Sequence, residues 1–288
     1  MLVEPIRATP TSASDPTVSV VIPTFHREET VVEAVRSALD QRGVTVEVLV
    51  LDDSAEGSAR AGLEAIGDAR VRYIQRAVPS GGNPALVRNE GLALARGRFV
   101  HFLDDDDLLE PGALAATVAA LERSPNAGVA IGTVVPFGED AAVLQQQEAY
   151  FGAAARRLRT AQTKFMLVAA MLFDTTPLVN SECTIRRESA RAVGGYSTSV
   201  SRCEDVDFYL RAIRHSGFVF VDQPVVRYRT GAPSLMHSLK DAGMIVDSYR
   251  QIYRQYRSQY GAAELAAMRM LAIVGSAAAA VALWLGMA

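Results

Sequence analysis

The sequence of 288 residues predicts an α/β fold, a mostly parallel sheet flanked by helices, with a helical extension at the C-terminal end. In the first half of the chain, short apolar runs alternate with segments whose apolar residues recur at helical spacing. Several of these apolar runs end directly at aspartate or proline. Strands that alternate with helices are expected to be parallel, because a parallel neighbour is reached only through a crossover connection.

The first half of the chain contains five expected strands. They cover Val18–Ile22, Val46–Leu51, Val71–Gln75, Phe99–Leu103 and Val129–Val135. Pro23 is expected to end the first strand, since proline has no backbone N–H for a ladder. Helices are expected between the strands, over 28–39, 58–66, 85–95 and 111–121. Gly97 is expected to close the third helix, and Pro111 to lie in the first turn of the fourth.

The pattern is looser in the second half. The segment from Gly138 to Thr176 has no clear strand and is expected to be mostly helical. Beyond it we expect a strand over 178–185 and helices over 187–193 and 205–215. One or two closing strands are expected over 218–228, broken by Pro224, and then a basic, aromatic helix over 249–260.

Composition and charge limit the classes of function. Apolar residues make up 49% of the chain and charged residues 21%, as in an ordinary globular enzyme. The net charge of −3 argues against nucleic acid as the main partner, because a surface that follows phosphates needs a basic excess. Cys183 and Cys203 lack metal-finger spacing and are expected to be reduced, structural thiols in a reducing compartment.

The two ends of the chain differ in character. Residues 1–16 are rich in proline, threonine, serine and alanine and are expected to form a disordered leader. The run from Leu271 to Met287 carries no charge. Four arginines precede it, as on the cytoplasmic flank of a membrane segment: Arg250, Arg254, Arg257 and Arg269. Three interpretations stay open for this run: a membrane-associated or spanning tail, a packing or oligomerisation helix, and a frayed end.

Four consecutive aspartates, Asp104 to Asp107, follow the fourth expected strand. Ligands of open α/β sheets bind outside the carboxyl ends of the strands, where Thr24 and Asp53 are also expected. An aspartate at a strand end can also serve only as a helix cap, and for Asp52 and Asp53 this explanation carries as much weight as ligand binding. A cap needs only one carboxylate, so capping does not explain four in a row. Four adjacent carboxylates repel each other by about a few kcal/mol per close pair, which a bound cation relieves. We therefore expect Mg²⁺ or Mn²⁺ here, shared with substrate phosphates.

Phosphatases of the haloacid-dehalogenase type also place Asp-x-Asp after a buried strand. They require threonine or valine two positions after the second aspartate, where this chain has Leu108. Their later lysine and acidic pair are not evident in order. The sequence therefore does not favour that class.

Five segments stand in order along the chain: Val18–Arg27, Val48–Ser54, Arg88–Gly97, Phe102–Pro111, and a block from Glu188 to Arg211 that contains Gly194-Gly-Tyr196 and Glu204-Asp205. Together they resemble glycosyltransferase family 2, over about 18–229. The resemblance implies the GT-A fold, which is Rossmann-like, and an inverting transfer of a sugar from a nucleotide-sugar donor. Any one segment is a weak signal, but five in order at sensible spacing are a strong one.

The resemblance also implies which residues bind the donor nucleotide. Pro23, Phe25 and Arg27 would line the nucleotide pocket. Asp53 would accept a hydrogen bond from the base, which fits the N–H of a pyrimidine, and Arg88 would lie near the donor.

The acidic cluster and the acceptor side receive roles in the same way. Asp104 and Asp106 would be the metal and sugar-nucleotide carboxylates, with Asp105 in the variable place between them at the donor. Asp205 would be the general base, since the acceptor hydroxyl must lose a proton as it attacks. The alternative for Asp205 is that it only charges the first turn of a helix together with Glu204.

Histidines and arginines outside these motifs leave alternatives open. His237, in the loop 229–238, is either an additional metal ligand or a solvated loop histidine. An arginine cluster in the helical segment either recognises an anionic or lipid-linked acceptor or forms a solvated helix face; it comprises Arg156, Arg157 and Arg159. Structural roles are expected for the remaining histidines, His26, His101 and His215.

The sequence thus predicts a metal-dependent inverting glycosyltransferase with a UDP-sugar or dTDP-sugar donor and a saccharide, lipid-linked or small-molecule hydroxyl acceptor. The alternatives are a nucleotidyltransferase and a non-catalytic, membrane-attached nucleotide-sugar-binding protein. The nucleotide-sugar half is expected over 17–137, the acceptor half over 138–232 and the helical extension over 233–288. We expect a cytoplasmic protein, peripheral or C-terminally anchored at the membrane face, whose last helix contacts a membrane surface or a second copy.

Overall fold

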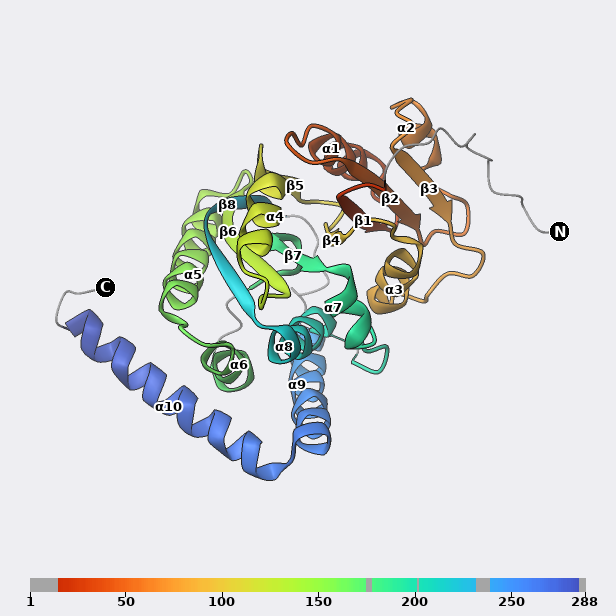
Figure 1. Ribbon diagram of the computed structural model, residues 1–288. Coiled ribbons are helices and arrows are strands. Elements are labelled where there is room, and N and C mark those ends of the chain that lie inside the picture. The colour runs from red at the N-terminus through yellow and green to blue at the C-terminus, as the bar shows by residue number, and fades with distance from the viewer. Residues whose placement is uncertain (1–14, 175–177, 201, 232–238, 285–288) are drawn as a thin grey trace.

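The computed structural model describes residues 15–174, 178–200, 202–231 and 239–284 (Figure 1). The strands are β1 (Val18–Thr24), β2 (Val46–Asp52), β3 (Val71–Gln75), β4 (Phe99–Phe102), β5 (Leu108–Leu109), β6 (Val129–Phe137), β7 (Cys183–Arg186) and β8 (Phe218–Arg229). The helices are α1 (Glu28–Leu39), α2 (Arg60–Glu64), α3 (Pro84–Leu94), α4 (Ala113–Arg123), α5 (Ala141–Thr160), α6 (Lys164–Phe173), α7 (Arg187–Ala192), α8 (Glu204–Ser216), α9 (Leu239–Tyr260) and α10 (Ala262–Trp284), with a 3₁₀ turn η1 (Asn180–Glu182) before β7.

All eight of these strands join one sheet, in the order β3-β2-β1-β4-β7-β6-β8-β5. The pairings of β2 with β3, β1 with β2, β1 with β4, and β6 with β8 are parallel. Strand β7 runs antiparallel to both β4 and β6, and the short β5 runs antiparallel to β8. The sheet therefore has a fully parallel half and a mixed half.

Helices cover both faces of the sheet. On one face Val18, Val20 and Ile22 of β1 pack with residues of α1, α2 and α4. On the other face Val21 packs with a core that includes residues of α3, α5, α6 and α8. Because β1 is buried on both faces, its sequence is a continuous apolar run rather than an alternating one.

Strand β1 continues through Pro23 to Thr24, so the expectation that Pro23 ends the strand is wrong. The carbonyl of Val21 accepts a hydrogen bond from the N–H of Leu103, so residues 21 and 23 turn their backbone polar groups toward β4. The residue pairing of β1 with β4 stops at Val21 and Phe102. Residue 23 has no paired residue of β4 on that side, so the missing N–H of proline removes no hydrogen bond from the sheet.

Two expected helix boundaries are also corrected. Helix α3 ends at Leu94, and Gly97 lies beyond it, where a Cβ atom would be 2.5 Å from the backbone nitrogen of Ser19. Glycine is required at 97 by this close approach to β1 and not as a helix end. Helix α4 begins at Ala113 after Gly112, whose φ of 78° is left-handed, so Pro111 precedes the helix.

The second half follows the expected helices but shortens one strand. The helical expectation for 138–176 is confirmed by α5 and α6. The strand expected over 178–185 is reduced to β7, because residues 180–182 form η1 instead. Strand β8 runs through Pro224 as one strand, with register shifts against β6 at Ile131, Thr133 and Val134.

The C-terminal helices α9 and α10, blue in Figure 1, form an angled pair against the outer side of α6 and α8. Ile252 and Tyr256 of α9 and Met268 of α10 are buried in the same core as α6 and α8. Helix α9 and the first half of α10 therefore pack against the body of the protein. Over the described residues, no helix is both long and apolar enough to cross a bilayer.

Candidate active site

The four aspartates follow β4 at the carboxyl edge of the parallel strands. Asp105 and Asp107 are buried, whereas the side chains of Asp104 and Asp106 are 32% and 20% exposed. Arg27, which follows β1, donates to Asp106 and lies 3.2 Å from the Oδ1 of Asp105 through its Nη1. One guanidinium from the neighbouring strand end thus offsets part of the negative charge of the cluster.

The protonation of the cluster reflects its burial and crowding. Burial raises the pKa of Asp105 to about 7, against the lowering effect of Arg27. Burial and the neighbouring charge of Asp104 also raise the pKa of Asp106 and of Asp107. Nearby positive charge counteracts this shift, as a bound cation would, because it favours the ionised form of each carboxylate.

Asp107 has a structural role. Its Oδ1 accepts a hydrogen bond from the backbone N–H of Arg229, 3.1 Å away at the end of β8. The Nε of Arg229 in turn donates to the backbone oxygen of Asp106 at 2.9 Å. Asp107 therefore ties the end of β8 to the cluster and does not cap the following helix, which starts at Ala113.

Asp104 is held by residues from three separate segments. Its Oδ1 accepts from Nη2 of Arg88 at 2.8 Å and from Nδ2 of Asn180 at 3.1 Å. Its backbone N–H donates to the Oγ of Ser181 at 3.1 Å. The hydroxyl of Tyr196 donates to the Oδ1 of Asn180 at 2.8 Å and fixes which way that amide points. The orientation of Asp104 is thus set by α3, η1 and the loop before α8.

Arg88 connects Asp104 to the acceptor side. While its Nη2 contacts Asp104, its Nη1 donates to the Oε1 of Glu204 at 2.6 Å. Arg88 is buried, and its guanidinium lies 5.5 Å from the ring centre of Tyr196. A buried, doubly paired arginine fixes the distance between the acidic cluster and the start of α8.

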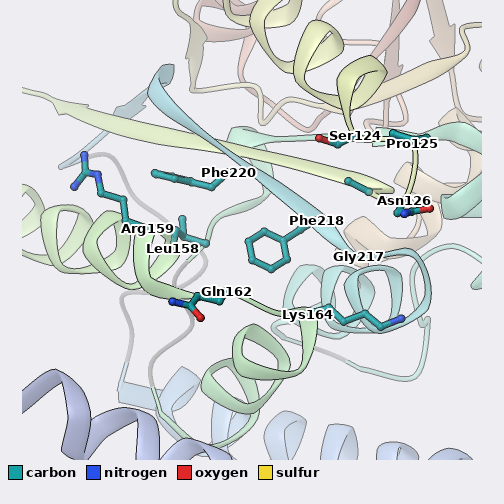
Figure 2. A pocket seen from close by; sticks show the side chains of 12 residues that line it. Ser124, Pro125, Asn126, Leu158, Arg159, Gln162, Lys164, Gly217, Phe218 and Phe220 are labelled. Carbon is teal, nitrogen blue, oxygen red and sulfur yellow. The ribbon is translucent and has the colours of Figure 1, made fainter.

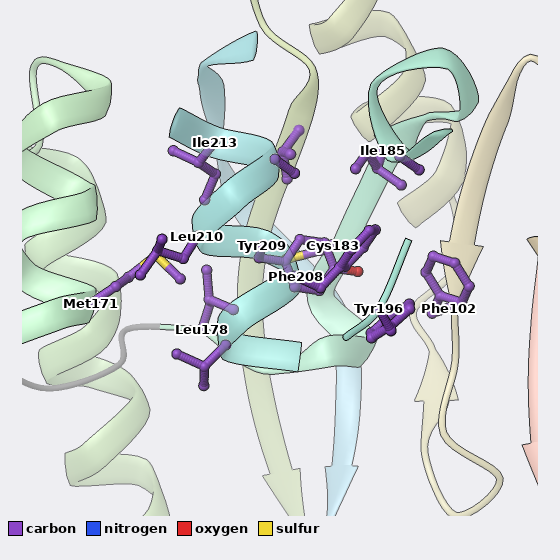
Figure 3. Packing of buried hydrophobic residues seen from close by; sticks show 14 of the residues in the cluster. Phe102, Met171, Leu178, Cys183, Ile185, Tyr196, Phe208, Tyr209, Leu210 and Ile213 are labelled. Atoms are coloured by element: carbon purple, nitrogen blue, oxygen red, sulfur yellow. The ribbon is translucent and has the colours of Figure 1, made fainter. Parts of the chain in front are cut away.

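The aromatic packing beneath α8 reinforces this placement. Tyr196 stacks on Phe208 with ring centres 4.1 Å apart, and the ring of Phe102 lies nearly perpendicular to both (Figure 3). Asn89 binds the backbone of Tyr196 twice, at 2.8 and 2.9 Å. A Cβ at Gly195 would come 2.3 Å from the Oδ1 of Asn89, which explains the glycine before Tyr196.

Asp205 lies in the first turn of α8, next to Glu204 and partly exposed. Burial raises its pKa to about 7, and the charge of Glu204 adds to the shift while Arg88 opposes it. Its Oδ1 also accepts from the backbone N–H of Val206 at 2.8 Å. Asp207, by contrast, is buried in an ion pair with Arg211 at 2.6 Å. Of the two aspartates, Asp205 is the one with a side chain open to a ligand.

Asp53 follows β2 and is buried, and one of its carboxylate oxygens already accepts two hydrogen bonds. Its Oδ1 accepts from Nη1 of Arg76 at 2.6 Å and from the backbone N–H of Ser80 at 2.7 Å. Its Oδ2 accepts from the Oγ of Ser80 at 2.5 Å and retains a lone pair for one further donor. Asp52 is a structural residue that binds Ser54, Tyr73 and the backbone of Ala59.

The remaining expected donor residues lie on the same edge. Pro23 is half-buried within β1, and Phe25 follows it with 56% of its side chain exposed. The backbone carbonyl of Thr24 accepts a hydrogen bond from the backbone N–H of Asp53 at 2.9 Å, which brings the ends of β1 and β2 together. The structure therefore gathers Phe25, Arg27 and Asp53 at adjacent strand ends.

Sequence reasoning missed four residues of this site. Arg76 directly follows β3, so the rule that placed Asp53 and Asp104 at strand ends could have found it. Ser80 and Asn180 lie in loops and carry no signal of their own in the sequence. Glu204 was seen only as a neighbour of Asp205, although it is the direct partner of Arg88.

The acidic cluster fits a divalent cation in its donor chemistry. Among the residues that the structure describes, no three His, Cys, Asp or Glu side chains form a metal cage. Mg²⁺ is commonly bound through one or two carboxylates together with substrate phosphates, so a full protein cage is not required. Asp104 and Asp106 are the partly exposed carboxylates of the cluster and suit that arrangement. His237 lies outside the described residues.

Other titratable groups have the structural roles expected of them. His101 is buried between Thr184 and the carbonyl of Ser181, both at 3.0 Å, and burial lowers its pKa to about 4. Cys183 and Cys203 are buried free thiols. Arg159 forms an exposed pair with Asp222, which agrees with the interpretation of a solvated helix face.

A pocket of about 500 Å³ lies away from these residues (Figure 2). Phe218 at the start of β8, Phe220, Leu158 and the loop before β6 line part of it. Since β6 and β8 run in the same direction as β4, their amino ends lie at the edge of the sheet opposite the aspartates. This pocket is therefore distinct from the candidate active site.

With this geometry established, comparisons place the chain among known proteins. The model of the family "Glycosyl transferase family 2" matches residues 19–194. The chain belongs to this family. The fold expectation, GT-A with C-terminal helices, is confirmed by the similarity to Staphylococcus aureus TarS residues 1–349 in complex with UDP-GlcNAc, with a TM-score of 0.63 at 18% identity over 84% of this chain and 66% of that one.

Curated relatives match over shorter stretches. The succinoglycan biosynthesis protein ExoO of Rhizobium meliloti is 40% identical over 116 residues, which is 40% of this chain and 32% of ExoO. GalNAc(5)-diNAcBac-PP-undecaprenol beta-1,3-glucosyltransferase of Campylobacter jejuni is 34% identical over 117 residues, 40% of this chain and 36% of that enzyme. The chain thus spans about a third of the length of these two relatives.

Proposed function

We propose that this glycosyltransferase family 2 protein transfers a sugar from a nucleoside-diphosphate donor to an acceptor hydroxyl, with inversion and with help from a divalent cation. The observation that carries the proposal is the buried bridge of Arg88. It joins Asp104, at 2.8 Å, to Glu204, at 2.6 Å, and Glu204 neighbours Asp205. A donor-binding carboxylate and a candidate base are thereby held on one rigid unit, as a direct displacement requires.

The donor side suits a uridine or thymidine nucleotide. Asp53 offers an acceptor and Arg76 a donor side by side, which complements the N–H and carbonyl groups of such a base. Phe25 adds an exposed ring beside them. TarS, which shares the fold, binds UDP-GlcNAc in its solved complex. These points support UDP or dTDP as the nucleotide.

Asp104 and Asp106 would hold Mg²⁺ or Mn²⁺ together with the donor diphosphate. A bound divalent cation would stabilise the negative charge that develops on the leaving diphosphate. Arg27, which already contacts Asp105 and Asp106, is placed to add positive charge at the same point. Asp105 would remain beside the donor as a buried carboxyl, and a cation bound by its two neighbours would favour its ionised form.

Asp205 is proposed to take the proton from the acceptor hydroxyl. Its pKa of about 7 suits a general base, since a base is most effective when its pKa lies near the working pH. Attack by the hydroxyl on the face opposite the diphosphate inverts the anomeric centre. No covalent intermediate and no further nucleophile are required.

The acceptor is proposed to be a lipid-linked saccharide. The Campylobacter relative is named for transfer to an undecaprenol diphosphate-linked saccharide, and ExoO for the biosynthesis of succinoglycan. In this proposal residues 17–137 bind the donor, 138–232 bind the acceptor, and 233–288 form a helical extension. The reaction would take place on the cytoplasmic side of the membrane, where nucleotide sugars are made.

One assay tests the activity. The protein is incubated with Mn²⁺ and UDP-, dTDP- and GDP-sugars, with and without EDTA, and release of the nucleoside diphosphate is measured. We expect EDTA-sensitive release from a UDP- or dTDP-sugar. Release of pyrophosphate from a nucleoside triphosphate and a sugar phosphate would instead identify a nucleotidyltransferase, and donor binding without turnover a non-catalytic protein.

The Asp205→Asn variant tests the base. It should lower transfer about a hundredfold to ten-thousandfold, while UDP binding measured by calorimetry stays unchanged. Transfer at the normal rate by Asp205→Asn would exclude Asp205 as the base.

A further inference from the structure

Helix α10 buries one side and exposes an apolar stripe on the other. Met268 is buried, and Leu265 and Ala272 pack against the core shared with α6. On the opposite side of the helix, Met270, Ile273 and Val274 have exposed fractions of 61%, 56% and 61%. These three residues stand at the spacing i, i+3, i+4, so they form one continuous face. Such a face, with no partner among the residues that the structure describes, is a candidate interaction surface.

Charge is distributed unevenly around this stripe. Helices α9 and α10 carry five basic residues, Lys240, Arg250, Arg254, Arg257 and Arg269, and three acidic ones, Asp241, Asp247 and Glu264, although the whole chain carries −3. Asp247 pairs with Arg250 at 2.9 Å. Glu264 is occupied by an ion pair with Arg214 at 2.7 Å. Arg254, Arg257 and Arg269 are exposed and have no ion pair with any residue that the structure describes. Among the described side chains, α9 and α10 therefore present three exposed arginines without an ion-pair partner, of which Arg269 directly precedes the apolar stripe on α10.

That combination fits an anionic lipid surface better than a second copy of the chain. A helix in the membrane interface buries apolar side chains at the headgroup boundary and keeps arginine at the charged headgroups. A two-fold dimer through the same patch would bring like-charged arginines of two copies together. The sequence beyond Met270 contains no charged residue, so the apolar character continues toward the end of the chain.

We propose that α9 and α10 dock the protein on an anionic membrane surface, with Met270, Ile273 and Val274 inserted at the headgroup boundary and Arg254, Arg257 and Arg269 paired with lipid phosphates. This docking involves no residue of the candidate active site. It therefore stands or falls independently of the proposed sugar transfer, and its test contains neither donor nor acceptor.

The test is sedimentation of the full chain with vesicles of phosphatidylcholine, with or without phosphatidylglycerol. We expect binding to the anionic vesicles, weaker binding as salt is added, and little binding to neutral vesicles. The double variant Ile273→Glu, Val274→Glu should weaken binding at least about tenfold, because two apolar side chains leave the interface. Val78→Glu is the matched control, since Val78 is 73% exposed in the loop after β3, and should leave binding unchanged.

A second pair of variants separates the electrostatic part. Arg254→Gln and Arg257→Gln should each weaken binding to anionic vesicles about fivefold and leave the apolar face intact. Thermal melts confirm that each variant is folded, which is expected because these side chains are exposed. The proposal would be overturned by equal binding to neutral and anionic vesicles, or by full binding of the double glutamate variant. It would also be overturned if the wild type were a dimer without lipid and the double glutamate variant a monomer.

Discussion

The two halves of the sheet build the site in different ways. In the parallel half, β1, β2, β3 and β4 run in one direction, and the residues that follow them, such as Arg27, Asp53, Arg76 and Asp104, reach the same edge directly. In the mixed half, Asn180 and Glu204 reach that edge from a 3₁₀ turn and a helix start. The first arrangement follows from strand direction alone. The second depends on contacts between segments more than seventy residues apart, such as that of Asn180 with Asp104.

Arg88 lies where the two halves meet, and its removal should have the largest effect. In Arg88→Met, Asp104 and Glu204 lose a shared buried partner, so the free energy of unfolding should fall by about 3–5 kcal/mol. Urea denaturation measures the change. Arg98→Met is the control: Arg98 and its partner Glu122 are both exposed, so its loss should cost about 1 kcal/mol or less. Equal effects in the two variants would contradict the role of Arg88 as the link between the halves.

Asp53 tests whether the parallel half binds the nucleotide. Asp53→Asn removes charge-assisted hydrogen bonds to Arg76 and Ser80, and the dissociation constant for UDP should rise about tenfold or more. Glu47→Gln is the matched control, because Glu47 is similarly buried and paired with arginine but lies at the opposite end of β2. Calorimetric titration should give normal UDP affinity for Glu47→Gln. Weakened affinity in both variants would indicate a general loss of stability instead.

The pH dependence tests the acceptor side. The pKa of Asp205 is about 7 in the folded protein, above its ordinary value near 4, so the folded state retains a proton that the unfolded state releases between about pH 4 and pH 7. The free energy of unfolding contributed by this group therefore falls as pH rises through that window. The wild type should lose more stability than Asp205→Asn between pH 5 and pH 8 in urea denaturation.

The rate of transfer should also depend on pH. It should fall toward about tenfold per pH unit below pH 7, because the base must be ionised. A flat rate profile between pH 5 and pH 7 would argue against this assignment.

Arg159 should give the smallest effect of all. Its pair with Asp222 is exposed, so Arg159→Ala should leave both the free energy of unfolding and the rate of transfer essentially unchanged. Denaturation and the transfer assay measure both. A selective loss of transfer to an anionic acceptor would instead support the acceptor-recognition interpretation of the arginine cluster.

The parallel half was largely predictable for a physical reason. Strand β3 and helix α1 have the boundaries that apolar periodicity indicates, because the spacing of apolar residues within each segment already favours that conformation. The same logic fails at Pro23, where the direction of the backbone polar groups decides whether proline is tolerated. It fails again at Gly97, whose requirement comes from its contact with Ser19 and not from its own helix.

The mixed half was predictable only in part. Its helices α5, α6 and α8 are visible in the sequence, but the antiparallel insertion of β7 between β4 and β6 is not. Local sequence carries no code for which distant strand will pair. For the same reason the expected strand over 178–185 contains a 3₁₀ turn at Asn180–Glu182, whose conformation is fixed by contacts with Asp104 and Tyr196.

The sequence by itself determined the family, the α/β class and the position of the acidic residues at strand ends, because these depend on local pattern and on the order of motifs. Only the tertiary structure decided what each acidic residue does. Asp105 and Asp106 meet Arg27, Asp107 ties down β8, Asp104 shares Arg88 with Glu204, and Asp205 alone of its helix turn remains partly exposed beside that pair. Charge, burial and hydrogen-bond partners are set by neighbours distant in sequence, so four identical side chains in a row acquire different chemistry only once the chain is folded.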